Sequence, residues 1–297
     1  ELFDGMVPTP DDCVRAVVDF SAHVKGVFPQ RQILGIGIAA PGFIDLSNGD
    51  ILSIGRVPIW KSYPICRRLQ AALNLPVYIA NDVDCMAFAE LRDTHAPRAE
   101  NLAYVGFDEG VKVSLFLKGE LHKGTLGNAG LTSTHLLRVS DLAIPEDAPQ
   151  LLTINGISHL FEARLAGFAD DAQMHYAGIL AVVSLRERVQ LILAQANRTM
   201  PICQNLVQDL IKLLAVAVAN MTLLVQPDSV VIGGLMSVLP DDVFAILEGE
   251  IRRYLPELVS HNTIIQQGKL IAQDGAALGA IYHFLQSYLS LSASDLV

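Results

Sequence analysis

The sequence predicts an α/β layer fold with a mainly parallel sheet, and two features of the residue pattern support this. Short apolar runs that suit buried strands alternate with longer segments whose apolar residues recur at helical spacing. Glycine, proline and asparagine clusters separate these segments where loops are expected. Strands that alternate with helices are typical of units in which helices cover a parallel sheet.

The first hundred residues supply the first strands and helices of this fold. Residues 11–27 place valines and Phe20 at helical spacing, with Thr9 or Asp11 as the N-cap. The further expected elements are a strand over 33–40, a β excursion over 43–52, a loop over 55–60, a helix over 65–73, a strand over 75–80 and a helix from Asn81 to about residue 91.

Residues 101–135 predict a hairpin followed by a glycine-rich loop. The strands are 104–107 and 111–117, and Phe107-Asp108-Glu109-Gly110 forms the turn. Backbone N–H groups at such a turn can cradle a phosphate, but the two carboxylates oppose an anion. The later elements are helices over 160–168, 172–196, 203–225, 240–255 and 275–291, and strands over 229–232 and 263–270.

After Pro97 the pattern changes from strands that alternate with helices to antiparallel strands. This change predicts a domain boundary near residues 98–100. We therefore expect an N-terminal lobe over 1–99 and a C-terminal lobe over 100–274. The final helix, about 275–297, is expected to pack on the first lobe.

Composition excludes several classes of function. The chain has a net charge of −10 and no block of lysine and arginine longer than a pair, which argues against nucleic-acid binding by these residues. No apolar run reaches the roughly 20 residues that cross a bilayer, and the first residues do not match a signal peptide, so a cytoplasmic location is expected. The scattered Cys13, Cys66, Cys85 and Cys203 predict structural thiols.

Four segments in order resemble the ROK family, which contains sugar kinases and sugar-responsive transcriptional repressors. They are GIGIAAPGFIDLSNGDI (35–51), LPVYIANDVDCMAFAE (75–90), KGELHKGTLGNAG (118–130) and QPDSVVIGGL (226–235). The resemblance implies an actin-like ATPase fold of two RNase-H-like α/β lobes, a sugar in the cleft between them and a homo-oligomer. The family's Asp-Leu-Gly phosphate motif and the repressors' winged helix-turn-helix do not occur here, so we expect the chain to be part of a longer protein.

Three matched positions carry functional roles in the family, and each has a simpler explanation. The resemblance implies that Asn81 and Asp82 bind a sugar, with Asp82 as general base in a kinase; both residue types are also favoured at helix N-termini. Glu162 matches a sugar-binding glutamate, or is a solvated helix residue. Gly233 and Gly234 match a nucleotide-side turn, or form an ordinary turn that needs small residues.

The kinases' phosphate loop is altered. Where they carry Gly-Thr-Gly-Ile-Gly, this chain has Asp108-Glu109-Gly110-Val111-Lys112, which keeps Gly110 and adds two carboxylates. Two carboxylates facing a triphosphate would repel it by several kcal/mol unless a metal or Lys112 intervened. ATP is therefore expected to bind poorly, and Gly110, Gly233 and Gly234 to mark a vestigial nucleotide site.

The sugar and zinc motifs are altered as well. The family's Gly-Glu-x-Gly-His is replaced by residues 130–135, which puts Leu131 at the glutamate position, Thr134 at the histidine position and His135 one residue out of register. No cysteine occurs over 151–160, where the family has a zinc motif, so no zinc is expected. Arg56 replaces a sugar-contacting asparagine; it could admit an acidic sugar or sugar phosphate, or be a solvated loop residue.

These features favour the effector domain of a ROK-type regulator, which binds a sugar or sugar derivative without a cofactor. Its ligands would be Asn81, Asp82 and Glu162, with Arg56 and His135 as additions, and DNA would be bound only by a segment absent from this chain. The alternative is a sugar kinase that uses ATP, magnesium and Asp82 as base. A third possibility is a degenerate member that serves only as a dimer scaffold.

Overall fold

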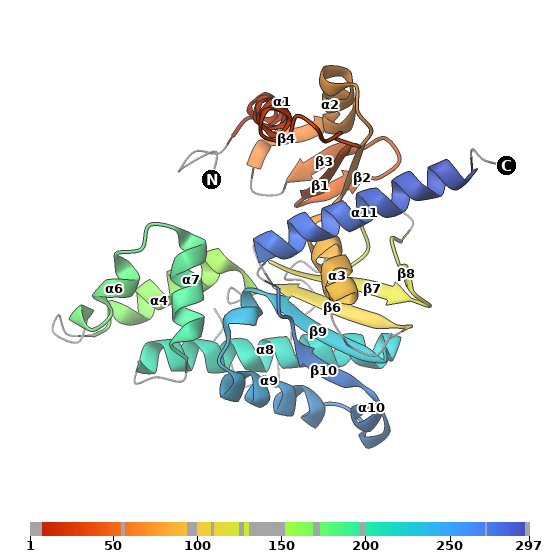
Figure 1. Cartoon of the computed structure of the whole chain (residues 1–297). Coiled ribbons are helices and arrows are strands. Elements are labelled where there is room, and N and C mark those ends of the chain that lie inside the picture. The colour runs from red at the N-terminus through yellow and green to blue at the C-terminus, as the bar shows by residue number, and fades with distance from the viewer. Residues whose placement is uncertain are drawn as a thin grey trace. The chain divides into compact units, whose positions relative to one another are not determined.

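The computed structural model describes residues 8–54, 57–93, 100–107, 110–124, 128–130, 152–168, 173–196, 200–270 and 272–294. The chain forms two compact units (Figure 1). The first comprises residues 1–94, 123–129 and 273–297, and the second comprises 95–122 and 130–272. The C-terminal helix and a short central segment therefore return to the N-terminal unit.

The first unit contains a small parallel sheet, an antiparallel sheet and four helices among its described residues. Its elements are α1 (Pro10–Val27), β1 (Ile36–Ala40), β2 (Phe43–Asp45), β3 (Asp50–Ile54), β4 (Val57–Tyr63), α2 (Ile65–Leu73), β5 (Val77–Asn81), α3 (Asp82–Asp93) and α11 (Ala272–Ser294). Strands β1 and β5 pair in parallel, and β2, β3 and β4 form the antiparallel sheet. Thr9 is the N-cap of α1 and forms a capping box with Asp12. The sequence had left Thr9 and Asp11 as the two candidates for this position.

The parallel pair is covered on both faces. On one face, Ala80 packs with Cys85 of α3 and Ala280 of α11, and Tyr78 contacts the ring of Phe284. On the other face, Ile36 and Ile38 join the core that includes residues of α1 and α2. Burial on both faces explains why these strands are apolar as far as Asn81, the last residue of β5.

The second unit is built on a five-stranded sheet in the order β10-β9-β6-β7-β8. Its elements are β6 (Leu102–Phe107), β7 (Val111–Leu117), β8 (Glu120–Leu121), α4 (Ile154–Leu165), α6 (Ala177–Leu180), α7 (Leu185–Ala194), α8 (Pro201–Val225), β9 (Ser229–Gly234), the 3-10 helix η3 (Leu235–Val238), α9 (Asp241–Arg253), α10 (Glu257–Asn262) and β10 (Ile264–Gln267). β10, β9 and β6 are parallel, whereas β6, β7 and β8 are antiparallel. Helices α8 and α9 run along one face of the sheet (Figure 1) and contribute to its core.

Three expectations from the sequence are corrected. The pairing is not mainly parallel: β1 and β5 form a parallel sheet, β2, β3 and β4 an antiparallel sheet, and the five-stranded sheet is mixed. Residues 57–63, expected to begin in a loop, form β4 because they pair with β3 and bury Trp60. The single helix expected over 172–196 is divided into α6 and α7, since Ser184 has extended backbone angles and caps α7 by accepting a hydrogen bond from the Glu187 N–H.

Helix α8 also corrects the expectation that no segment could span a membrane. Among the described residues it is the one helix long and apolar enough by length and composition. However, 61% of its most apolar window is buried inside the fold. Such burial is typical of the core helix of a folded domain, and α8 supplies much of the core of the second unit.

Candidate sugar site at the carboxyl edge of the parallel strands

Asn81 and Asp82 lie where β5 ends and α3 begins. In the parallel register Asn81 is opposite Ala40, the last residue of β1, so both strands end at the same edge. Ligands of α/β proteins bind preferentially outside the carboxyl ends of parallel strands. The topology therefore places the predicted sugar-binding pair at an edge suited to a ligand.

The buried side chain of Asn81 shapes this edge. Its Oδ1 accepts hydrogen bonds from the N–H groups of Val83 at 3.0 Å and Asp84 at 3.4 Å, as an N-cap does. Its Nδ2 donates to the Gly42 carbonyl at 3.4 Å. Gly42 has φ +86°, and a Cβ there would lie 2.2 Å from the Ser53 carbonyl oxygen. Asn81 therefore joins the loop after β1 to the start of α3.

Asp82 occupies the first turn of α3 and is half-buried. One of its carboxylate oxygens accepts a hydrogen bond from the Val83 N–H at 2.9 Å. The helix dipole stabilises negative charge at this end, and a carboxylate can accept hydrogen bonds from sugar hydroxyls. The cap interpretation is correct for Asn81, and it is compatible with a ligand role for Asp82.

Glu162 lies on α4 and forms an ion pair with Arg188 of α7. The Arg188 guanidinium also donates to Ser158 Oγ at 3.2 Å and to the Val182 carbonyl at 2.9 Å. The Glu162 side chain stays 52% exposed. Sequence reasoning missed Arg188, because nothing in the spacing of these residues shows that α4 and α7 are neighbours. The ligand role of Glu162 stays a prediction.

Gly233 and Gly234 end β9 against the buried side chain of Tyr104 on β6. A Cβ at Gly233 would lie 2.3 Å from the Tyr104 hydroxyl oxygen, and Gly234 has φ +67°. The Gly234 N–H donates to the Tyr104 hydroxyl at 3.2 Å. Close packing against Tyr104 is thus sufficient to require small residues here. This agrees with the simpler explanation from the sequence, an ordinary turn that needs small residues.

The segment at the start of β7 is open at Gly110 but packed at Lys112. A Cβ at Gly110 would meet no atom within 4 Å. Lys112 is buried, and its ammonium donates to Ser114 Oγ at 3.3 Å. The Val113 N–H donates to the Gly130 carbonyl at 2.9 Å. From Lys112 onward the backbone is therefore part of a packed strand.

Several predicted residues lie outside the described part of the chain: Arg56, Asp108, Glu109, Leu131, Thr134 and His135. Of the described candidates, the structure brings Asn81 and Asp82 together in the first unit, and Gly233 and Gly234 together in the second, which also holds Glu162 and Gly110.

The described residues contain no group of three or more histidine, cysteine or acidic side chains arranged to hold a metal. Burial raises the pKa of the Cys66 thiol to about 12 and that of Cys203 to about 11. Neither thiol forms a reactive thiolate at neutral pH.

Comparisons with known proteins agree with this arrangement of elements. A solved ROK family transcriptional regulator, a homologue of the E. coli MLC protein, superposes with a TM-score of 0.73 at 20% identity and covers 92% of this chain and 69% of its own. A ROK family glucokinase from Streptomyces griseus, solved with glucose and AMPPNP, gives a TM-score of 0.72 at 19% identity and covers 92% and 88%. At these identities the likeness shows the shared fold.

Sequence comparison extends this likeness. The xylose repressor of Caldicellulosiruptor bescii is 22% identical over 211 residues, which are 68% of this chain and 50% of the repressor. The chain thus spans half the length of that relative. The sequence model of the ROK family matches residues 7–138 and 177–287. The chain therefore belongs to the ROK family and has its α/β, actin-like ATPase fold.

Proposed function

We propose that this chain is the effector domain of a ROK-type transcriptional regulator, which binds a sugar or sugar derivative without phosphorylating it. The observation that carries the proposal is the packing of Lys112 at the position of a phosphate-loop glycine in the kinases. The relatives include both repressors and sugar kinases, so the choice depends on the residues of this chain.

A phosphate loop needs exposed backbone N–H groups and room for the phosphates. Lys112 instead places a long side chain inside the fold, hydrogen-bonded to Ser114. In the strand register Lys112 is opposite Gly106, and Val111 is opposite Phe107, so these residues belong to a paired ladder. The sequence adds Asp108 and Glu109 just before, whose charges oppose ATP.

The sugar-binding half of the proposal rests on Asn81 and Asp82. Asn81 is held in place by three hydrogen bonds, and the Asp82 carboxylate is fixed at the helix start. Glu162, oriented by Arg188, is a further candidate ligand, and so are Arg56 and His135. In this proposal the protein is a cytoplasmic homo-oligomer that needs neither ATP nor zinc, and DNA is bound by a segment outside this chain.

A sugar kinase is the second candidate, because the TM-score to the Streptomyces griseus glucokinase, 0.72, is nearly that to the regulator, 0.73. ATP with magnesium would supply the phosphoryl group. Asp82 would then accept the proton of the attacking sugar hydroxyl.

Calorimetric titration of this chain with glucose, xylose and MgATP, together with an assay for sugar phosphate, distinguishes an effector domain from a sugar kinase. We expect at least one sugar to bind saturably and MgATP to show neither binding nor phosphate transfer. Asp82→Ala should weaken sugar binding at least tenfold, through loss of a charge-assisted hydrogen bond. Asp19→Ala, on the exposed face of α1, is the matched control and should have no effect.

Transfer of phosphate from ATP to a sugar would contradict the proposal of a regulator and support that of a kinase. The support would be strongest if Asp82→Asn abolished the transfer. Unchanged sugar affinity in Asp82→Ala would remove Asp82 from the binding site under either function.

A further inference from the structure

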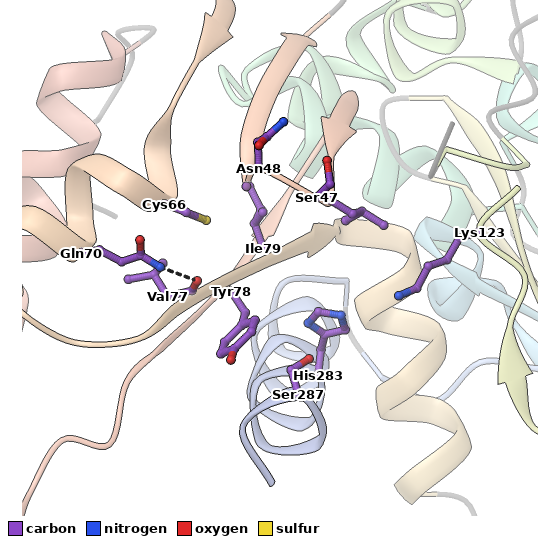
Figure 2. Close-up of a pocket in the computed structure, with 12 residues that line it drawn as sticks. Ser47, Asn48, Cys66, Gln70, Val77, Tyr78, Ile79, Lys123, His283 and Ser287 are labelled. Carbon is purple, nitrogen blue, oxygen red and sulfur yellow. Dashed lines mark hydrogen bonds between the residues drawn. The ribbon is translucent and has the colours of Figure 1, made fainter. Parts of the chain in front are cut away.

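A pocket of about 340 Å³ is lined only by residues of the first unit (Figure 2). Its walls come from the turn between β2 and β3, from α2 and β5, from the segment after β8 and from α11. The polar residues that matter are Ser47, Asn48, Gln70, Lys123, His283 and Ser287. Neither Asn81 nor Asp82 lines it.

We propose that this pocket binds a small hydroxylated oxyanion, with the anionic group at Lys123 and His283 and the hydroxyls at Asn48 and Gln70. Its volume lies near the lower end of the roughly 300–1,000 Å³ range of small-molecule sites, which suits a ligand of monosaccharide size.

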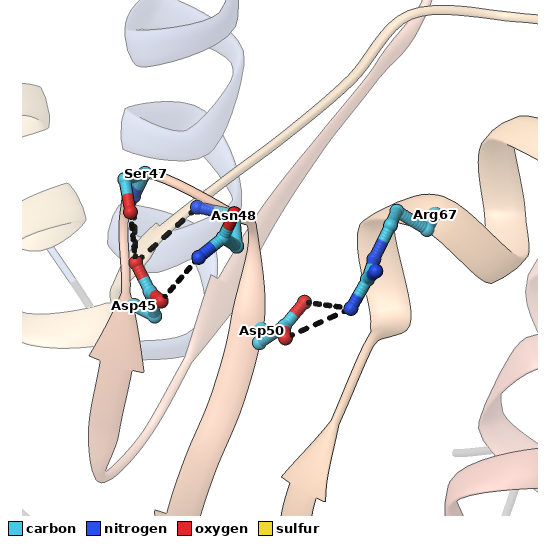
Figure 3. A network of polar contacts seen from close by, with 5 residues as sticks. All are labelled: Asp45, Ser47, Asn48, Asp50 and Arg67. Carbon is cyan, nitrogen blue, oxygen red and sulfur yellow. Dashed lines mark hydrogen bonds and ion pairs between the residues drawn. The ribbon is translucent and has the colours of Figure 1, made fainter.

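The hydroxyl-binding end is set by an acidic turn (Figure 3). The Asp45 carboxylate accepts hydrogen bonds from Ser47 Oγ at 2.5 Å and from Asn48 Nδ2 at 2.8 Å. On α2, Gln70 Nε2 donates to the Val77 carbonyl at 3.4 Å. Each bond uses one N–H of an amide, so the amide oxygens and the second N–H groups of Asn48 and Gln70 are the groups that could bind a ligand's hydroxyls. Amide oxygens accept hydrogen bonds from hydroxyl groups.

The oxyanion-binding end consists of Lys123 and His283. Figure 2 shows the Lys123 ammonium directed toward the His283 ring. Among the described residues Lys123 has no acidic ion-pair partner. The His283 ring also packs edge-to-face on Phe88 of α3, with centroids 6.0 Å apart, which fixes its position.

The charges around His283 explain why an anion would be favoured there. Burial, and secondly the positive charge of Lys123, lower the pKa of His283, whereas Asp84 on α3 acts in the opposite direction. An anion between Lys123 and His283 would pair with the ammonium and accept a hydrogen bond from the imidazole. It would also raise the pKa of His283, so binding should take up protons and strengthen as the pH falls from 8 to 6.

The carboxylates near the hydroxyl-binding end of the pocket already have partners within the protein. Asp45 is bound by its turn, and Asp50 is paired with Arg67 at 3.1 Å (Figure 3). They still carry negative charge on that side of the pocket. An asymmetric ligand, with its anion at Lys123 and its hydroxyls at the turn, fits this distribution better than a bare anion.

Titration calorimetry of the 297-residue chain with gluconate tests the proposal, with glucose 6-phosphate, inorganic phosphate and glucose as further probes. We expect saturable gluconate binding, weakened about tenfold in Lys123→Gln by loss of a charge-assisted contact. Lys61→Gln, an exposed lysine on β4, should bind normally. Titration in two buffers of different ionisation enthalpy should reveal proton uptake, which His283→Gln abolishes. Glucose 6-phosphate shows whether carboxylate or phosphate is preferred, and glucose and phosphate should each bind more weakly than the combined ligand.

Absence of saturable binding for both hydroxylated anions, or equal losses in Lys123→Gln and Lys61→Gln, would overturn the proposal. Asp82→Asn separates this pocket from the sugar site proposed above. Gluconate affinity should be unchanged in that variant, and its loss would mean that gluconate occupies the Asp82 site instead.

Discussion

The side-chain amide of Asn128 forms two hydrogen bonds with the backbone of Ile44, as a neighbouring strand would. The Ile44 N–H donates to Asn128 Oδ1 at 2.9 Å, and Asn128 Nδ2 donates to the Ile44 carbonyl at 3.0 Å. The Ala129 N–H in turn donates to the Lys123 carbonyl at 3.1 Å. One asparagine thus attaches the segment that carries Lys123 to β2.

Asn128→Ala should lower the free energy of unfolding by about 1–3 kcal/mol, because it leaves both backbone groups of the buried residue Ile44 without these partners. Urea denaturation followed by circular dichroism measures this. Asn128→Asp keeps an acceptor for the Ile44 N–H but loses the donor, so it should also destabilise. A loss below the error of the method for both variants would show that the amide contributes nothing to stability.

Arg188 should matter more for stability than its ion-pair partner Glu162. Arg188→Met is expected to cost about 2–4 kcal/mol, because the Arg188 side chain is only 16% exposed and bonds Ser158 and the Val182 carbonyl as well. Glu162→Gln should cost less than about 1 kcal/mol, since that side chain is half exposed. Urea denaturation of both variants gives the comparison. Equal costs would mean that Arg188 stabilises the fold mainly through its ion pair with Glu162, and not through its hydrogen bonds to Ser158 and the Val182 carbonyl.

Gly233 and Gly110, which match positions on the nucleotide side of the family's kinases, should respond differently to the same substitution. Gly233→Ala places a methyl group 2.3 Å from the Tyr104 hydroxyl and should destabilise by about 2–3 kcal/mol. Gly110→Ala meets open space and should change stability by less than about 0.5 kcal/mol. Thermal unfolding of the two variants is the measurement. Comparable shifts in melting temperature would contradict packing as the reason for glycine at position 233.

The turn at Asp45 should make stability depend on acid pH. Hydrogen bonds from the side chains of Ser47 and Asn48 lower the pKa of Asp45 from 3.8 to about 2. The stabilisation is therefore complete above the unfolded pKa near 3.8 and is lost as the pH falls toward 2. Urea midpoints at pH 5 and pH 2.5 should differ less in Asp45→Asn than in the native chain. An identical pH dependence of the two proteins would assign the acid sensitivity to other carboxylates.

Local pattern was sufficient for much of the fold. The helices at 10–27, 82–93, 241–253 and 272–294 follow from apolar spacing and end signals, which depend on residues close in sequence. Asn81 was recognised as a cap for the same reason, because its hydrogen bonds reach only two and three residues along the chain. The four ordered motifs were enough to predict the family.

Long-range contacts decided the rest. β4 exists because β3 is its partner, and a strand's partner is not encoded in its own residues. Arg188 meets Glu162, and Lys123 meets His283, only because chain segments distant in sequence pack together. The sequence by itself determined the fold class, the family and the N-cap role of Asn81. Only the tertiary structure decided which charges are buried, which are paired and where the pocket beside Lys123 and His283 lies, because burial and pairing depend on neighbours brought together by folding.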